Sequence, residues 1–160
     1  MSEHDLPLLN LTAGDVHCAR DPTMLTTILG SCVSVCLWDG ARGVGGMNHF
    51  VLPYERPGMD NARSGPVAMR QLISGLLKLG AQMPALRAKL FGGAAVLRVG
   101  PSAVHIGSEN VRVALEALHD HRIPVVARRT GGQHGMSLRF VTSTGEALAR
   151  GFAAAFAIDR

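Results

Sequence analysis

The chain has 160 residues and a mass of 16.9 kDa, a length that favours one compact domain over two. Hydrophobic residues make up 47% and charged residues 18%, which excludes a globally disordered protein. Aromatic residues make up only 4%, which argues against a base-stacking nucleic-acid module. The net charge of +4 arises in residues 81–160, where 10 Lys and Arg face 5 Asp and Glu. No basic run reaches the length typical of a nucleic-acid surface, so we expect no nucleic-acid partner.

No run of about 18 uncharged apolar residues occurs, so we expect no membrane insertion. The opening residues lack the basic and apolar regions of a signal peptide, and we therefore expect a cytoplasmic protein. Residues 1–10 are predicted to form a flexible N-terminal tail, and residues 11–160 a single domain. No internal repeat or low-complexity linker divides them.

The first predicted elements lie between residues 25 and 52. The segment LTTILGSCVSVCL, residues 25–37, is rich in β-branched residues and predicts two strands that meet at a break at Gly30-Ser31. Asp39-Gly40 is a turn signal, and residues 44–52 predict the returning strand. Together these features indicate a β-hairpin.

Two helices and further strands are predicted downstream. Apolar residues at helical spacing, with Pro66 suited to the first turn and Gly80 to the end, predict a helix over 66–79. A second apolar stripe from Val111 to Leu118 predicts a helix that begins near 108–110. Strands are predicted at 88–90, 123–127, 137–141 and 146–152. The fold class is therefore α+β: a layered sandwich in which two amphipathic helices cover mainly antiparallel sheets.

One pair of residues in the hairpin has chemical potential. A turn centred between Gly40 and Ala41 pairs residues whose numbers sum to 81, which sets Cys32 opposite His49. Directly opposed residues have Cβ atoms about 4.5–5.5 Å apart, close enough for a Cys–His nucleophile pair. A neighbouring imidazole favours the thiolate, and backbone amides beside Gly30-Ser31 could form an oxyanion hole.

Structural alternatives to this pair remain open. A free cysteine in a strand is commonly an inert small hydrophobe, and a lone histidine often only satisfies a buried hydrogen bond. A one-residue bulge would also turn either side chain to the other face. Cys18 and Cys36 are most simply core residues, and the odd number of cysteines argues against a disulfide framework. The remaining histidines are interpreted as surface residues: His119, His121 and His134.

A zinc site is a weaker alternative. If residues 32–36 were helical, Cys32 and Cys36 could approach each other and be joined by His17, Cys18 or His49. However, neither CxxC nor HExxH is present, and the Gly-Gly turns lack the GxGxxG or GK[ST] context of a phosphate cradle. We expect neither a metal nor a cofactor.

Several motifs resemble the CheD family of bacterial chemoreceptor glutamine deamidases. They follow one another in order over nearly the whole chain, which makes a chance match improbable: LGSCVSVCLWD at 29–39, GGMNHFVLP at 45–53, AMRQLISGLLKLGA at 68–81, AKLFGGA at 88–94, IGSEN at 106–110 and TGG at 130–132.

The resemblance implies a cysteine hydrolase. Such an enzyme converts receptor glutamine side chains to glutamate through a thioester, with loss of ammonia, and can also hydrolyse receptor glutamyl methyl esters. The family's nucleophile falls on Cys32 and its histidine on His49. Its threonine falls on Thr26, six residues before the cysteine, where it would orient His49. The resemblance also implies a layered α/β fold, and as partners a chemoreceptor cytoplasmic domain and a CheC-type phosphatase.

Three positions depart from the family pattern. Ser64 stands where an aromatic often follows the arginine, Arg129 where an acidic residue usually precedes TGG, and Met136 where an arginine is common. These departures put partner recognition in doubt and motivate an alternative function. In that alternative the protein is a non-catalytic chemotaxis adaptor that binds receptors or a CheC-type phosphatase. We expect a monomer in either case.

Overall fold

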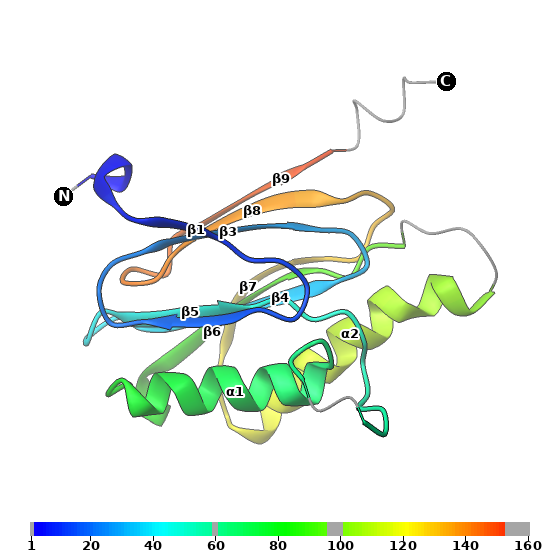
Figure 1. The fold of residues 1–160 in the computed structure, drawn as a ribbon, viewed down its shortest axis with the longest axis horizontal. Helices are drawn as coiled ribbons and strands as arrows, with labels where there is room; N and C mark the ends of the chain where they lie inside the picture. The colour runs from blue at the N-terminus through cyan, green and yellow to red at the C-terminus, as the bar shows by residue number, and fades with distance from the viewer. Residues whose placement is uncertain (1, 59–60, 96–100, 153–160) are drawn as a thin grey trace.

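The computed structural model describes residues 2–58, 61–95 and 101–152 (Figure 1). Two β-sheets are stacked, and two helices lie against the outer side of one of them. The α+β layered sandwich predicted from the sequence is therefore confirmed. No helix in the described ranges is both long and apolar enough to cross a membrane.

The four-stranded sheet has the order β1-β3-β8-β9, and no α-helix of the described residues covers its outer face (Figure 1). Its strands are β1 (Leu8–Asn10), β3 (Met24–Leu29), β8 (Met136–Val141) and β9 (Ala147–Gly151). Pairing is antiparallel except between β1 and β3. Residues 8–10 were predicted to belong to a tail, but they pair with β3. Three residues are too few to show a strand pattern by themselves.

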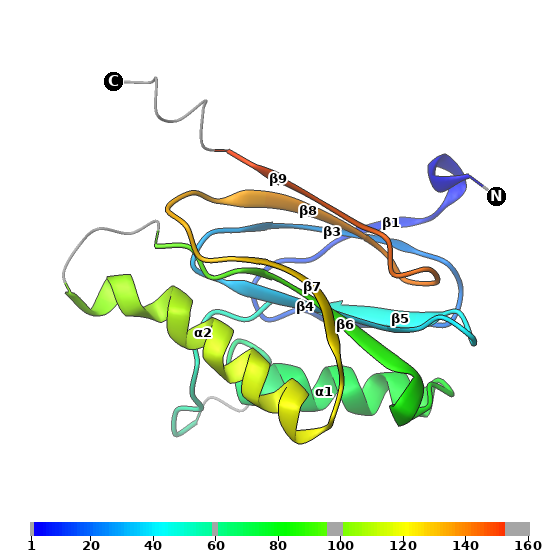
Figure 2. The same ribbon diagram turned by 180° about the vertical axis from the view of Figure 1, so that it is seen from behind.

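The five-stranded sheet has the order β2-β5-β4-β6-β7. Its strands are β2 (Val16–Ala19), β5 (Val44–Asn48), β4 (Val33–Asp39), β6 (Leu86–Gly92) and β7 (Val125–Thr130). Only β6 and β7 are parallel. The connection between them is a crossover through α2, which lies beside both strands when the molecule is seen from behind (Figure 2).

Helix α1 (Gly65–Lys78) follows the predicted pattern, with a proline in its first turn and Gly80 at a φ of 103° just after its end. Short 3₁₀ turns occur at Glu3–Asp5 and Met83–Ala85. Helix α2 (Pro101–Asp120) begins earlier than the predicted start near 108–110. That prediction was late because the apolar stripe used to place it begins only at Val111.

Two hydrophobic cores result from this stacking. The helix–sheet core contains the inward faces of α1 and α2 and alternate residues of β4, such as Val33, Val35 and Leu37. The inter-sheet core lies between the two sheets and includes Leu25, Leu29 and Phe140. Because strand side chains alternate between faces, Cys36 and Met47 point into the inter-sheet core.

The register of the first hairpin differs from the prediction. Cys36 pairs with Met47 and Asp39 with Val44, so paired residue numbers sum to 83 rather than 81. The connection is longer because the buried Asp39 carboxylate accepts hydrogen bonds from Arg42 and from the Gln82 amide, which keeps Asp39 at the end of β4. The shift of two residues leaves each side chain on its predicted face.

Candidate active site

Cys32 lies in the short connection between β3 and β4, just before the first residue of β4. The observed register sets Ser34, rather than Cys32, opposite His49, because Val33 bridges to Phe50. Cys32 is half-buried and packs against the inter-sheet core. The sequence prediction that Cys32 directly opposes His49 is therefore wrong by two residues.

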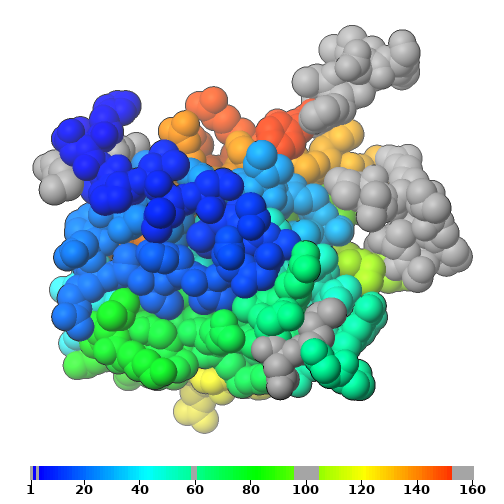
Figure 3. Space-filling view, in the orientation of Figure 1, coloured from blue at the N-terminus to red at the C-terminus, as the bar shows by residue number. Residues whose placement is uncertain are grey.

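His49 is 5% exposed and also points into the layer between the sheets. Its backbone is fixed on both sides by the segment before β2: the His49 amide donates to the Asp15 carbonyl at 3.1 Å, and the Gly14 amide donates to the His49 carbonyl at 2.8 Å. This N-terminal segment, blue in the space-filling view, covers the side of the molecule between the four-stranded sheet and α1 (Figure 3). His49 and Cys32 therefore belong to the same layer of the molecule, and the segment before β2 fixes the backbone of His49.

The imidazole of His49 is oriented by Thr27. Its Nδ1 lies 2.7 Å from the Thr27 hydroxyl oxygen, and the Thr27 hydroxyl is itself 2.7 Å from the Leu11 carbonyl. A carbonyl can only accept, so the single hydroxyl proton of Thr27 goes to Leu11 and its oxygen accepts the Nδ1 proton. The other ring nitrogen, Nε2, is then unprotonated and available as a base.

Thr26 does not contact His49. It is the preceding residue of β3, so its side chain points to the opposite face of the sheet, where its hydroxyl donates to the Asn10 side chain at 3.0 Å. Thr27, by contrast, is 2% exposed. The threonine beside the imidazole is thus one position later than the residue expected from the family motif.

The loop that carries Cys32 is held through its carbonyl groups. The Ala94 amide donates to the Gly30 carbonyl at 2.9 Å, and the Gly93 amide donates to the Cys32 carbonyl at 2.8 Å. In the described part of the chain, the amides of Ser31 and Cys32 donate to no backbone carbonyl. The Cys32 amide hydrogen-bonds to its own sulfur. These two amides are therefore the backbone donors that lie nearest to Cys32 along the chain.

The protonation states follow from burial. Burial raises the pKa of the Cys32 thiol, while its own backbone amide and the charge of Arg63 oppose this rise. Burial also lowers the pKa of His49, against the opposing charge of Asp15. Both effects favour a neutral thiol and a neutral imidazole in the resting protein.

The other cysteines lie in less favourable surroundings. Burial raises the pKa of Cys18 to about 11, and it raises the pKa of the fully buried Cys36 further. The three cysteines are free, as the argument against a disulfide framework predicted. Within residues 2–58, 61–95 and 101–152, no three His, Cys, Asp or Glu side chains are grouped as metal ligands.

The departures from the family pattern have different surroundings. Arg129 is exposed on β7 and donates to the Ala149 carbonyl of β9. Ser64 is fully buried at the N-cap of α1, and Met136 is 5% exposed in the inter-sheet core. Only Arg129 lies where a partner protein could touch it, so the doubt about partner recognition is limited to that residue.

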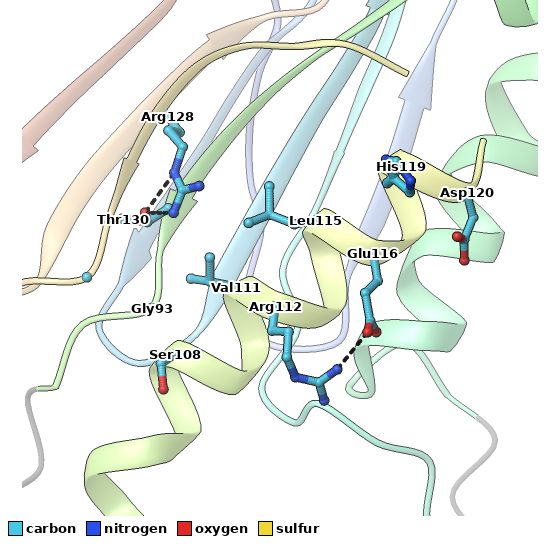
Figure 4. A pocket seen from close by; sticks show the side chains of 11 residues that line it. Gly93, Ser108, Val111, Arg112, Leu115, Glu116, His119, Asp120, Arg128 and Thr130 are labelled. Carbon is cyan, nitrogen blue, oxygen red and sulfur yellow. Dashed lines mark hydrogen bonds and ion pairs between the residues drawn. The ribbon is translucent and has the colours of Figure 1, made fainter. Parts of the chain in front are cut away.

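An open groove of about 630 Å³ lies between α2 and β7. Val111 and Leu115 of α2 face Arg128 and Thr130 of β7 across it, and Arg112 and Glu116 form an ion pair on its outer side (Figure 4). Gly93, whose amide bonds to the Cys32 carbonyl, lines one end. The groove therefore ends at a residue that hydrogen-bonds to the loop carrying Cys32.

Comparison with known proteins identifies the family. The profile of the family described as "CheD chemotactic sensory transduction" matches residues 51–151. The chain is 46% identical over 156 residues to a protein of Rhodospirillum rubrum named "Probable chemoreceptor glutamine deamidase CheD", covering 98% of this chain and 89% of that protein. It is 45% identical to an Anaeromyxobacter dehalogenans protein named "Probable chemoreceptor glutamine deamidase CheD 1", covering 88% and 82%.

A protein of Trichlorobacter lovleyi with the same name as the first is 42% identical, covering 86% of each chain. Each of these matches spans most of both proteins at an identity well above what chance produces. The chain therefore belongs to the CheD family, whose relatives are named as chemoreceptor glutamine deamidases.

Proposed function

We propose that this protein deamidates glutamine side chains of chemoreceptors by cysteine catalysis, with Cys32 as nucleophile and His49 as general base and acid. The observation that carries the proposal is the hydrogen bond between Thr27 and Nδ1 of His49, which leaves Nε2 free in the layer into which Cys32 also packs. The bond fixes the tautomer in which Nε2 is a base, which is the form that a Cys–His pair requires. The names of the relatives supply the substrate class.

The first half of the reaction forms a thioester. The thiol proton passes to His49 Nε2 as the sulfur attacks the glutamine Cδ, so charge develops only in the transition state. The amides of Ser31 and Cys32 would donate to the developing oxyanion. The proton on His49 is then given to the leaving nitrogen, the C–N bond breaks and ammonia departs.

The second half hydrolyses the thioester. His49 Nε2 takes a proton from a water molecule that attacks the same carbon, the C–S bond breaks, and the proton returns to the sulfur. The products are a glutamate side chain, ammonia and the free thiol. A glutamyl methyl ester would follow the same path with methanol as the leaving group, so we propose this second activity for the same residues.

In this mechanism the threonine role moves from Thr26 to Thr27. Thr27 is a positioning residue because it touches His49 and not the substrate. Its bond to Nδ1 also stabilises the imidazolium that forms during the reaction, as the third group of a catalytic triad does. The Leu11 carbonyl completes this chain of bonds from the N-terminal segment.

The test is incubation with a chemoreceptor cytoplasmic fragment, with mass spectrometry and an ammonia assay as readouts. Each Gln-to-Glu change adds about 1 Da, and Cys32→Ala is expected to abolish it because no nucleophile remains. Cys18→Ala is the matched control and should retain activity. An unchanged rate in Cys32→Ala would refute the assignment.

The same experiment separates the adaptor alternative. A non-catalytic adaptor would bind the receptor fragment equally well with and without Cys32, and would release no ammonia in either form. Binding to a CheC-type phosphatase stays a prediction. Of the three residues that differ from the family pattern, Arg129 is exposed, and its substitution would test this binding.

A further inference from the structure

Two motifs that the proposed mechanism does not use meet at the loop that carries Cys32. Residues 91–93, FGG, end β6, and residues 107–110, GSEN, lie on α2. Although they are far from Cys32 in sequence, both contact the loop from Gly30 to Cys32. In the close view, Gly93 lies beside the turn of α2 that carries Ser108 (Figure 4).

The FGG turn fits closely against this loop. Gly92 has a φ of 104°, and a Cβ there would lie 2.2 Å from the Cys32 carbonyl oxygen. A Cβ on Gly93 would lie 2.8 Å from the carbonyl of Gly107 on α2. Larger residues at either position would push the turn away from the loop or from the helix. The loop, the turn and the helix are therefore packed backbone to backbone.

Asn110 connects the helix to both halves of the site. Its side chain is fully buried, and Nδ2 donates to the Ser31 carbonyl at 3.0 Å and to the Val51 carbonyl at 2.9 Å. Ser31 precedes the nucleophile, and Val51 lies two residues after His49. Because both partners are carbonyls, the amide can face them only with its nitrogen.

The oxygen of Asn110 has no hydrogen-bond partner within the described residues. Burying an unpartnered acceptor destabilises a protein, and an apolar side chain would avoid that loss. The carboxamide of Asn110 is therefore explained by the hydrogen bonds that its two N–H groups donate. Both are used on the two segments that carry the site.

The effect on Cys32 follows from the geometry of the peptide group. The Ser31 carbonyl and the Cys32 N–H belong to one planar trans peptide, so they point in opposite directions. When Asn110 holds the carbonyl, the Cys32 N–H is directed away from α2. That amide is the one that hydrogen-bonds to its own sulfur and that would donate to the oxyanion.

We propose that Asn110 is a positioning residue for the deamidation: by binding the Ser31 and Val51 carbonyls, it orients the Cys32 amide and fixes the nucleophile loop relative to the His49 segment. This inference rests on the proposed function of Cys32 and His49. It assigns a role to the GSEN motif that neither the nucleophile nor the histidine accounts for.

The test compares Asn110→Asp with wild type. The carboxylate keeps the shape of the side chain, but it offers no donor and repels both carbonyls. We expect kcat on the receptor fragment to fall by at least about tenfold, with a change in KM of less than about threefold, because misplacing reacting groups slows chemistry more than binding. We also expect the rate of Cys32 alkylation by iodoacetamide to rise only at higher pH, because the amide no longer favours the thiolate.

Thr142→Val is the matched control. Thr142 is also fully buried, and its hydroxyl accepts from the Thr23 amide at the opposite end of β3 from Cys32. We expect a lower melting temperature with unchanged kcat and alkylation profile. If Asn110→Asp fails to fold, Asn110→Ala removes the donors without repulsion and is measured below its melting temperature.

The proposal is overturned if the folded Asn110 variants keep the wild-type kcat and alkylation profile and lose only thermal stability. Wild type and Cys32→Ala are assayed in parallel, so a missing activity is recognised as a failure of the proposed function. The pH profile of alkylation still tests Asn110 in that case, since it needs no receptor.

Discussion

The helix–sheet core and the inter-sheet core bury polar side chains in different ways. On the helix side, Asn48 accepts from the Val35 amide and donates to the Met69 sulfur. Asn110 donates to the Ser31 and Val51 carbonyls, so both asparagines join segments that are distant in sequence. In the inter-sheet layer, Thr27 and His49 bond to each other, and a half-buried cysteine packs at the same core. The proposed site therefore lies in the layer between the two sheets.

Cys36, in β4, and Cys32, just before β4, also differ in their surroundings. Cys36 is fully buried in the inter-sheet core, whereas Cys32 lies at its margin, in a loop whose Ser31 and Cys32 amides donate to no backbone carbonyl of the described residues. Both thiols have a pKa that burial raises, and a nearby cation opposes the rise at each, Arg63 at Cys32 and Lys89 at Cys36; Cys32 also has its own backbone amide, which opposes the rise further. Position in the layer, more than residue type, distinguishes the fully buried thiol from the proposed nucleophile.

The largest expected effect is on stability, and a second measurement, kcat, distinguishes the two cores. Leu72→Ala in the helix–sheet core and Leu29→Ala in the inter-sheet core should each lower the free energy of unfolding by about 2–5 kcal/mol, since both leucines are at most 1% exposed. Urea unfolding measures this. Only Leu29→Ala should also lower kcat in the folded protein, because Leu29 precedes the nucleophile loop. Equal kcat in both variants would break the comparison.

A smaller effect distinguishes the two faces of β3. Thr27→Val should lower kcat by about tenfold, because His49 loses the acceptor of its Nδ1 proton and its fixed tautomer. Thr26→Val, with the same chemical change on the exposed face, should leave kcat unchanged. Steady-state kinetics on the receptor fragment measures both. A larger loss in Thr26→Val would return the positioning role to the residue that the family motif indicates.

The smallest effect is a pH dependence of stability. Burial raises the folded-state pKa of Cys36 above its unfolded value, so unfolding is helped once the unfolded thiol ionises. The free energy of unfolding should therefore be unaffected by Cys36 below about pH 8.5 and should fall above it. In urea titrations between pH 8 and pH 10, Cys36→Ala should flatten this slope, even if the substitution also changes the free energy of unfolding by a constant amount. An identical slope would show that Cys36 does not contribute.

His49 contributes at the other end of the pH range. Its folded pKa is lowered by burial, so its contribution to stability is present above the unfolded value near 6.5 and is lost as the pH falls through the folded pKa. Together the two groups place the most stable range between about pH 6.5 and 8.5.

The sequence by itself determined the elements whose signals are local. Apolar spacing and the residues at its ends gave α1, and β-branched runs around Gly30-Ser31 gave β3 and β4. The same alternation set Cys32 and His49 on one face, and this survived an error of two residues in register because faces repeat every second residue. The family motif added the proposal that Cys32 is the nucleophile and His49 its partner.

Only the tertiary structure decided which groups support that pair. The choice between Thr26 and Thr27 depends on which face of β3 packs against the other sheet, and the role of Asn110 depends on a helix that crosses behind the loop. Neither has a local sequence signal, because a hydrogen bond between distant segments is set by how layers stack and not by the spacing of residues along the chain.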